Sequence, residues 1–497
     1  MRETEQKFLL ERGRELPGAD NLVTDLGSYS VERDRQEAVY YDTADLRLTR
    51  AGASLRFRSD DGWTVKLPQR QGGLLEREEI VLGSSDATGP PAEAVALVRA
   101  LCRSAPLDAV ATVSTDRREI RIVDRSGRDV GLIDDDRVRA SARPSGATSF
   151  HEVEFEISPD ADSELVAELV ARLRKAGARP NGQLPKVVRA LGEPARQAPD
   201  VVLGDRLSRR SAPSDLVQSC LANGVHRLVI HDPVARRDAD PEGVHQARVG
   251  TRRLRSDLRT LRPVLATART EPLRVELKWL GDLLGDVRDA DVLGEQLDEH
   301  LSALPESTRR DATALRRHLE RERREHLDTL RQALESRRYL ALLDNLVSAV
   351  CEPPLDRVRQ DPTKRDRRVV ERLARAPWKR LRRAVAKLSD RPSDPELHEV
   401  RKRAKQARYA YEATAPILGT AASRLAKELK KLQDVLGAHQ DAVVAADWLY
   451  HATVHIGDPK ASYAAGRLAQ VFANEHHKLR RKWQRKWERV RRAHRRL

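Results

Sequence analysis

Cysteine and aromatic residues are scarce in this chain of 497 residues, and each shortage excludes a class of structure or partner. The three cysteines, Cys102, Cys220 and Cys351, are isolated and odd in number, so they form neither a disulfide framework nor a CxxC metal site. Aromatic residues make up 4% of the chain, which leaves few stacking platforms for single-stranded nucleic acid. Nucleic acid is therefore the least favoured partner.

Long apolar runs are absent as well. Residues 1–5 lack the apolar run of a signal peptide, and no apolar stretch reaches the length of a membrane-spanning helix. The sequence thus predicts a soluble, cytoplasmic protein without a transmembrane segment. Its length is sufficient for two or three domains with separate cores.

Charge, in contrast, is abundant and unevenly spread. Residues 1–200 hold 30 Lys and Arg against 35 Asp and Glu, a balance of −5, whereas residues 201–497 hold 62 against 41, a balance of +21. The two parts are therefore expected to do different jobs. Only the second is a general binder of polyanions by charge.

Residues 1–195 are predicted to form a strand-rich domain. Glu152, Glu154 and Glu156 alternate with apolar residues, and so do Arg56 and Arg58, which places charge on one strand face and apolar side chains on the other. An antiparallel sheet with a solvated charged face is one interpretation. However, acidic strands occur at both ends of the domain and basic strands between them. This order favours a closed barrel whose lumen binds divalent cations and phosphate, because packed like charges need such compensation.

A helical pattern begins near residue 214, after a segment rich in Pro and polar residues, 196–213, that we interpret as a linker. The helical part contains a repeat: the motif His245-x-x-Arg248-x-x-x-Arg252-x-x-Arg255 returns 153 residues later as His398-x-x-Arg401-x-x-x-Lys405-x-x-Arg408. Residues at these offsets share one helix face. A second segment, 277–289, also recurs, as 429–441. Two aligned basic faces predict a surface for a long polyanion, with an ordinary solvated helix as the alternative.

The motifs of the first part resemble those of CYTH domains, also called triphosphate tunnel metalloenzymes. Glu3-x-Glu5-x-Lys7 resembles the ExExK signature of this family, and the segments 40–43, 55–58, 62–66 and 152–154 follow in the order that the family shows. Lys186 is similar to its late catalytic-site lysine. The resemblance covers residues 1–195 and implies an eight-stranded antiparallel β-tunnel that binds triphosphate with Mg²⁺ or Mn²⁺.

The resemblance also implies roles for individual residues. The metal ligands would be Glu3, Glu5, Asp134, Glu152, Glu154 and Glu156. The phosphate chain would be bound by Lys7, Arg56, Arg58, Lys66, Arg77, Arg117 and Lys186. Glu5, Lys7 and Lys186 would act in catalysis, with Glu5 taking the proton of the attacking water. Phosphoryl transfer to water depends on positioning and charge neutralisation, so no nucleophilic side chain is required.

One position departs from the family pattern. Some members place a cationic residue shortly before the Tyr-Tyr-Asp-Thr segment, 40–43, where this chain has Glu37. The departure leaves the substrate preference open.

The repeat resembles the CHAD domain, a conserved-histidine α-helical domain often found behind CYTH. Residues 240–255 match its first signature, 397–412 its second and 284–291 the turn between them. The resemblance covers residues 214–497 and implies two pseudo-symmetric helical bundles that bind inorganic polyphosphate. The implied binding residues are His245, Arg248, Arg252, Arg255, Arg288, His398, Arg401, Lys402, Lys405 and Arg408. Metal binding by the two histidines, or their simple burial in the bundle, remains an alternative.

Together, these patterns predict an α+β two-domain protein with a tunnel domain (1–195), a linker (196–213) and a helical domain (214–497). Its expected function is metal-dependent hydrolysis of tripolyphosphate, polyphosphate or an organic triphosphate, with the helical domain binding polyphosphate or docking on polyphosphate granules. Two alternatives remain: a non-catalytic polyphosphate-binding scaffold, and hydrolysis or cyclisation of ATP. The basic segment 476–497, with Trp483 and Trp487 one helical turn apart, either binds an anionic partner or packs on the helical domain.

Overall fold

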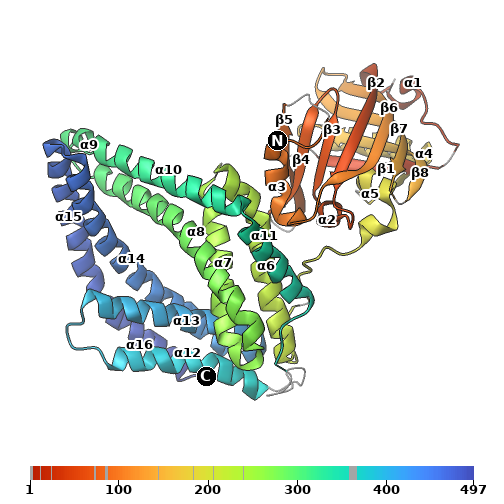
Figure 1. The fold of residues 1–497 in the computed structure, drawn as a ribbon. Helices are drawn as coiled ribbons and strands as arrows, with labels where there is room; N and C mark the ends of the chain where they lie inside the picture. Colours follow the sequence, from red (N-terminus) through yellow and green to blue (C-terminus); the bar gives the residue numbers. More distant parts are fainter. Residues whose placement is uncertain are drawn as a thin grey trace. The chain divides into compact units, whose positions relative to one another are not determined.

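The computed structural model describes residues 4–11, 13–23, 25–71, 74–83, 88–143, 145–182, 184–204, 206–238, 240–356 and 367–497, without the side chains of residues 4 and 69–77. The chain forms two compact units, Met1–Asp200 and Val201–Leu497 (Figure 1). The expected linker, 196–213, spans the division between them. No described helix is both long enough and apolar enough to cross a membrane.

The first unit is built on one antiparallel sheet of nine strands, in the order β5-β4-β3-β2-β6-β7-β8-β1-β9. The strands are β1 (Thr4–Leu10), β2 (Gly27–Asp42), β3 (Ser54–Arg58), β4 (Gly62–Gln71), β5 (Leu74–Leu82), β6 (Asp108–Asp124), β7 (Asp129–Ala142), β8 (Gly146–Ile157) and β9 (Ala178–Pro180). The predicted antiparallel β domain is confirmed, although it has nine strands where eight were expected. The difference is small, because β9 is only three residues long.

One face of this sheet is apolar and is covered by helices. Phe8, Ile133 and Phe155 are at most 1% exposed and lie in a core with residues of α1 (Ala19–Val23) and α4 (Ser163–Lys175). Towards the other end of the sheet, Trp63 and Val65 pack against α3 (Ala92–Cys102). Because successive strand residues point to opposite faces, the charged residues of these strands are left to the second face.

The second face is partly covered by a short helix, α5 (Lys186–Leu191). Val187 and Leu191 of α5 join Val113 of β6 and Val138 of β7 in a small apolar cluster. Val113 lies four residues before Arg117 on β6, so both side chains are on the same face. The docking of α5 therefore brings its first residue, Lys186, next to the charged part of this face.

One buried acidic residue of this unit, Asp42, has a structural role. Asp42, at the end of β2, accepts hydrogen bonds from the backbone N–H groups of Thr43, Leu48 and Thr49 at 2.7, 2.9 and 2.8 Å. These bonds hold the turn that leads into α2 (Arg47–Arg50). Asp42 thus shapes the fold of this turn.

The second unit is entirely helical in its described residues apart from one isolated β-bridge, and it contains both copies of the repeat. Its helices are α6 (Pro213–Arg237), α7 (Pro241–Leu261), α8 (Thr267–Ser302), α9 (Glu306–Asp311), α10 (Thr313–Glu335), α11 (Arg337–Cys351), α12 (Arg367–Ala386), α13 (Asp394–Leu418), α14 (Thr420–Ile456), α15 (Pro459–Arg480) and α16 (Trp483–His494). The His-Arg motif lies on α7 and again on α13, whereas the second repeated segment lies on the long helices α8 and α14.

The two motif helices are joined to one another by polar contacts. Arg252 Nε donates to Tyr409 Oη at 2.9 Å, and Arg253 Nη1 donates to Glu412 Oε2 at 2.6 Å. Both contacts run from α7 to α13. These contacts join the two copies of the repeat within the helical unit.

Candidate functional site

The charged face of the sheet carries a block of buried carboxylates. Asp134 and Asp136 of β7 stand directly opposite Glu154 and Glu152 of β8. Residues directly opposite in an antiparallel pair lie on the same face. All four side chains are buried, with Asp136 and Glu152 at 0% exposure. We call these four residues the carboxylate block.

Two lysines enter the carboxylate block from different elements. Lys7 Nζ of β1 lies 2.5 Å from Glu154 Oε1 and 2.7 Å from Glu5. Lys186 Nζ of α5 lies 2.7 Å from the same Glu154 oxygen and 2.8 Å from Asp136 Oδ2. Burial lowers the pKa of each lysine, but the neighbouring carboxylates outweigh it and the net pKa is raised. Both lysines therefore remain charged.

A third cation, Arg117 of β6, binds the other side of the block. Its Nε and Nη2 donate to the two oxygens of Asp136 at 2.8 Å each, and Nη1 lies 2.5 Å from Asp134 Oδ2. This forked geometry is typical of strong Arg–carboxylate pairs. Burial raises the pKa of Glu154, but Lys186 and Lys7 outweigh this effect and lower it, so Glu154 is ionised.

Two oxygens of the block are left without a hydrogen bond. Asp134 Oδ1 and Glu152 Oε1 are buried, and no described residue donates a hydrogen bond to either. Lys186 Nζ lies 3.4 Å from Glu152 Oε1, and Asn181 Nδ2 donates to the other Glu152 oxygen at 2.6 Å. Burial is the main cause that raises the pKa of Asp134 and of Glu152 to about 7.

These oxygens fit a hard divalent cation. Ligand atoms of Asp134, Asp136 and Glu154 all lie within 4.8 Å of one another. Mg²⁺ and Mn²⁺ prefer such all-oxygen donors, and an ion would supply a partner for Asp134 Oδ1, which accepts no hydrogen bond from a described residue. The chemistry of the donor set, together with this buried oxygen, therefore fits the implied metal.

The predicted phosphate-binding residues Arg56, Arg58 and Lys66 lie on the other half of the sheet. Arg56 Nη2 is 3.2 Å from Glu79 Oε1, and Lys66 Nζ is 2.9 Å from Glu79 Oε2. Arg58 Nη1 donates to Gln36 Oε1 at 3.2 Å. Arg58 also pairs with Asp60, and Arg56 Nη2 lies 3.4 Å from Asp61 Oδ2, so each of these cations has a carboxylate partner.

Strand register shows that this basic group and the carboxylate block share one face of the sheet. Arg58 of β3 stands opposite Ala38 of β2, which stands opposite Val113 of β6. Val113 and Arg117 are four residues apart on the same strand and so point to the same side. Glu37, next to Ala38, therefore lies on the opposite face, and its charge does not enter the site.

The remaining predicted residues are placed as follows. Glu156 stands opposite Glu5, and its charge contributes to the raised pKa of Asp134. Glu3 lies outside the described residues. Arg77 has its backbone in β5, but its side chain is outside the described part.

Sequence reasoning missed one member of the site, Asp136. The run Asp134-Asp135-Asp136 contained the signal, since strand alternation puts its first and third residues on one face. Asp135 points to the other face, where Arg118 Nε donates to it at 2.9 Å. Three consecutive identical residues obscured the alternation.

In the helical unit, cations from both motif helices converge around Lys405. Arg248 and Arg252 of α7, together with Arg401 and Arg408 of α13, lie close enough to affect its charge. Burial, followed by these four arginines, lowers the pKa of Lys405 to about 6. We call these five residues the inter-repeat basic cluster. An anion bound there would further relieve this repulsion, which Asp289 and Glu412 already offset at Arg248 and Arg408.

The arginines of the cluster are oriented by a small set of partners. Arg248 Nη1 donates to Asp289 Oδ1 at 2.8 Å, and the Arg408 guanidinium lies 4.6 Å from the centre of the Tyr409 ring. Nε of Arg408 is buried and donates no hydrogen bond to a described residue, although it lies 3.6 Å from Glu412 Oε1. The Arg408 fork therefore retains unused donors for a phosphate oxygen.

Both motif histidines lie near this cluster. Burial lowers the pKa of His245, which also lies near Arg288, and Nδ1 of His398 is 2.7 Å from Gln440 Oε1. Neither histidine belongs to a group of three metal-ligating side chains among the described residues.

Three residues of the predicted polyphosphate site lie apart from the cluster. Lys402 is 53% exposed and pairs with Glu399 at 2.6 Å; it follows Arg401 by a single residue and lies on another side of the helix. Arg288 pairs with Glu295 at 3.1 Å. Arg255 is affected by Asp282 and Arg274 instead of the cluster arginines.

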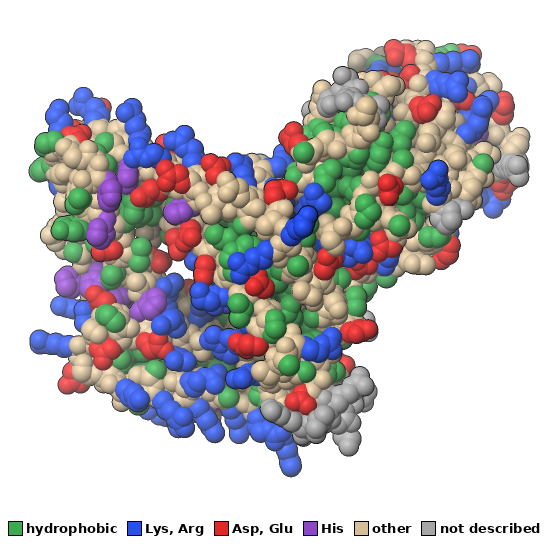
Figure 2. All heavy atoms as spheres, viewed as in Figure 1, with side chains coloured by type: hydrophobic (Ala, Val, Ile, Leu, Met, Phe, Trp, Pro, Cys, Tyr) green, Lys and Arg blue, Asp and Glu red, His purple; other side chains and the backbone are tan. Residues whose placement is uncertain are grey.

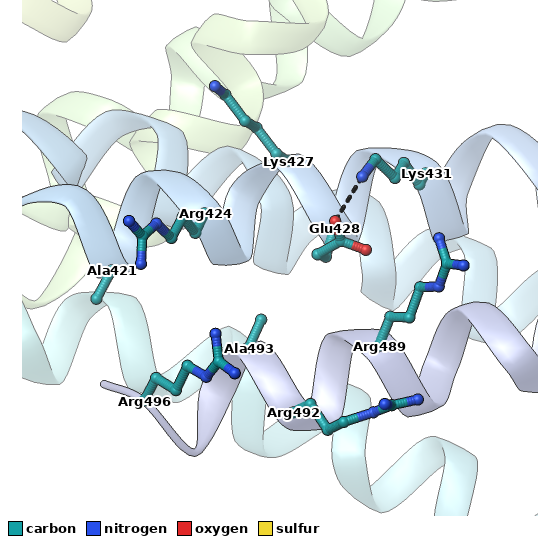
Figure 3. A pocket seen from close by; sticks show the side chains of 9 residues that line it. All are labelled: Ala421, Arg424, Lys427, Glu428, Lys431, Arg489, Arg492, Ala493 and Arg496. Atoms are coloured by element: carbon teal, nitrogen blue, oxygen red, sulfur yellow. Dashed lines mark hydrogen bonds and ion pairs between the residues drawn. The ribbon is translucent and has the colours of Figure 1, made fainter.

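The C-terminal tryptophans pack on the helical unit. Trp487 is 8% exposed and stacks on Trp378 of α12, with ring centres 5.5 Å apart, and Trp483 is also buried. This leaves the basic residues of α16 facing α14, where they line a pocket of about 360 Å³ (Figure 3). The pocket is lined by Ala421, Arg424, Lys427, Glu428, Lys431, Arg489, Arg492, Ala493 and Arg496. Lys and Arg side chains gather over the same edge of the unit, along α12 and α16 (Figure 2).

Removing the packing of Trp487 should weaken the helical unit. Trp487→Ala is expected to lower the free energy of unfolding by about 3 kcal/mol, because a buried ring is lost and its cavity cannot fully collapse. Urea denaturation followed by circular dichroism measures the change. The control is Tyr450→Ala, since Tyr450 is 69% exposed and its loss should change stability by less than about 0.5 kcal/mol. Equal effects of the two variants would contradict the packing role.

Comparison with known proteins identifies both parts of the chain. Residues 1–187 match the CYTH domain model, and residues 219–450 match the CHAD domain model. Rv2226 of Mycobacterium tuberculosis is 31% identical over 474 residues, which cover 91% of this chain and 89% of that protein.

Solved structures similar to the chain include two that align with more than half of it. PptA from Streptomyces chartreusis has a TM-score of 0.48 at 24% identity and covers 56% of this chain and 100% of its own. The CHAD domain from the plant Ricinus communis also has a TM-score of 0.48 at 24% identity, covering 59% of this chain and 95% of its own.

Proposed function

Because this chain belongs to the family of proteins that carry a CYTH domain followed by a CHAD domain, we propose that it hydrolyses tripolyphosphate or a related triphosphate with Mg²⁺ or Mn²⁺. The reaction takes place on the charged face of the first unit. We propose in addition that the inter-repeat basic cluster of the second unit binds inorganic polyphosphate. The observation that carries the enzymatic proposal is the carboxylate block, with its two buried oxygens that accept no hydrogen bond from a described residue.

In this proposal, Asp134, Asp136 and Glu154 hold the metal, with Glu152 completing the block. The bound ion neutralises charge on the phosphate oxygens and so assists attack by water. Glu5 lies 2.7 Å from Lys7 and is partly exposed, which leaves it accessible to accept the proton of that water.

The cations of the same face bind the phosphate chain. Lys7, Lys186 and Arg117 pair with the carboxylate block in this structure, and they would be available to bind phosphate oxygens if those carboxylates held a metal. Arg56 and Arg58 bind further along the substrate with forked, charge-assisted hydrogen bonds. No side chain acts as a nucleophile, because positioned charge is sufficient for this reaction.

The helical unit supplies affinity for long chains. A polyphosphate chain carries a charge on every phosphate, so a rigid group of arginines binds it without any base-reading contacts. Tethering this site to the first unit raises the concentration of polyanion near the charged face of that unit. The same binding would dock the protein on polyphosphate granules in the cytoplasm.

One assay tests the enzymatic proposal and its alternatives together. The full chain is incubated with tripolyphosphate, ATP, thiamine triphosphate or long-chain polyphosphate, with Mg²⁺ or Mn²⁺. We expect phosphate release that falls to the background rate when EDTA removes the metal, because the carboxylate block then repels the substrate.

Each alternative predicts a different product. Binding of polyphosphate without hydrolysis of any substrate would support a scaffold, and cyclic AMP with pyrophosphate would support cyclisation of ATP. Release of phosphate at an unchanged rate in EDTA would contradict the metal-dependent mechanism.

A further inference from the structure

A second group of metal-ligating side chains lies in the helical unit, outside the carboxylate block and the inter-repeat basic cluster. It consists of Asp394 at the start of α13, His439 of α14 and His476 of α15, whose ligand atoms lie within 4.8 Å of one another. His476 Nε2 is 2.9 Å from Asp394 Oδ1, and His439 Nε2 is 3.3 Å from the same oxygen. The two imidazole rings have centres 4.4 Å apart. Figure 2 shows histidines gathered over the part of this unit that contains α14 and α15.

His439 is the innermost member of the group. It is 2% exposed, and its Nε2 makes no hydrogen bond with a described residue although it faces Asp394. Its Nε2 therefore faces the other two side chains of the group from the interior of the unit.

The internal repeat shows that packing does not require a histidine at this position. Residue 439 lies in the second repeated segment, and the offset of 152 pairs it with Val287 in the first copy. Val287 is 0% exposed in α8. The first copy thus buries an apolar side chain, Val287, where the second buries the polar ring of His439. Burying a polar group without a hydrogen bond costs free energy. A bound ion would offset this cost.

We propose that Asp394, His439 and His476 form a transition-metal site that joins α13, α14 and α15, with Zn²⁺ as the preferred ion. Two imidazole nitrogens and one carboxylate oxygen suit Zn²⁺ better than Mg²⁺ or Ca²⁺. With metal–ligand bonds of about 2.0–2.1 Å, tetrahedral donors lie about 3.3 Å apart, close to the separations described above. The fourth position is left for water or an anion.

Arg480 affects how tightly this site binds a metal ion. Its Nη1 lies 3.3 Å from the same Asp394 oxygen, and it also donates to the Pro392 carbonyl. A metal ion therefore competes with the guanidinium for Asp394. This competition gives the proposal a distinctive consequence: removing Arg480 should strengthen metal binding, whereas a simple hydrogen-bond network would only lose stability.

The test is a titration of the metal-free full chain with Co²⁺ in excess Mg²⁺, which occupies the all-oxygen sites. We expect one equivalent of Co²⁺ to give the intense visible absorption of a four-coordinate nitrogen-bound ion, and Zn²⁺ to displace it. His439→Val, which copies the residue of the first repeat, should lower the affinity for Co²⁺ by at least about tenfold. Arg480→Gln should raise it.

Two further variants keep the test decisive. Asp394→Asn should also lower the affinity, and it serves where His439→Val fails to fold, as judged by circular dichroism. His451→Ala alters an exposed histidine of α14 and should leave the titration unchanged. The absence of intense absorption with the unmodified chain, or its persistence at equal affinity in His439→Val or Asp394→Asn, would overturn the proposal.

Discussion

Replacing Glu154 with glutamine should reduce metal-dependent phosphate release from tripolyphosphate by at least about a thousandfold. Glu154 is the shared partner of Lys7 and Lys186, and one of its oxygens belongs to the proposed metal site. Glutamine keeps the shape of the side chain but removes the charge that attracts the ion. The two lysines then lose a partner at the same time, so substrate and metal are both positioned less well.

The measurement is the initial rate of phosphate release at saturating substrate and increasing Mg²⁺ or Mn²⁺. Asp135→Asn provides a matched control, because Asp135 is buried in the same strand β7 but pairs with Arg118 on the opposite face. Asp135→Asn should retain activity if its circular dichroism spectrum matches that of the unmodified chain. If Glu154→Gln and Asp135→Asn have equal rates, the carboxylate block is not the catalytic site.

The second large effect is expected in the helical unit. Replacing Arg401 and Lys405 together with alanine should weaken binding of long-chain polyphosphate by about a hundredfold, since hydrogen bonds to charged groups contribute about 1.5–3 kcal/mol each. The dependence of the affinity on salt should also become shallower, because fewer counterions are released. Fluorescence anisotropy with labelled polyphosphate at several salt concentrations measures both changes.

A pH dependence follows from Lys405. Its pKa of about 6 means that it is mostly neutral at pH 7 in the free protein. A bound polyanion favours the charged form and raises this pKa, so binding takes up a proton. The affinity should therefore be highest at and below pH 6 and should fall as the pH rises from there. Lys405→Met should flatten this part of the profile.

The control for the cluster removes the same charge elsewhere. Arg489 and Arg492 line the pocket between α14 and α16, as Figure 3 shows. Replacing both with alanine removes two basic side chains, like the Arg401 and Lys405 double variant, but leaves the cluster intact. A loss of affinity as large as that of the cluster variant would show that binding depends on total charge and not on the inter-repeat basic cluster.

Much of the fold could be predicted from local patterns. The alternation of Glu152 to Ile157 gave the charged and apolar faces of β8, and the spacing of the His-Arg motif gave the basic stripes of α7 and α13. Both depend only on the geometry of a strand or a helix, which repeats every few residues. The same geometry, applied to residue 402, would have separated Lys402 from the stripe.

The sequence by itself determined the two units, their secondary structure and the sign of the charge on each face, because these properties follow from nearest neighbours along the chain. Tertiary structure decided which charges meet. The docking of α5 brings Lys186 to Glu154, strand order sets Arg117 beside Asp136, and contact between α7 and α13 surrounds Lys405 with four arginines. Such groupings join residues that are far apart in the chain. Their energies depend on burial and on distances between side chains, which no local period encodes.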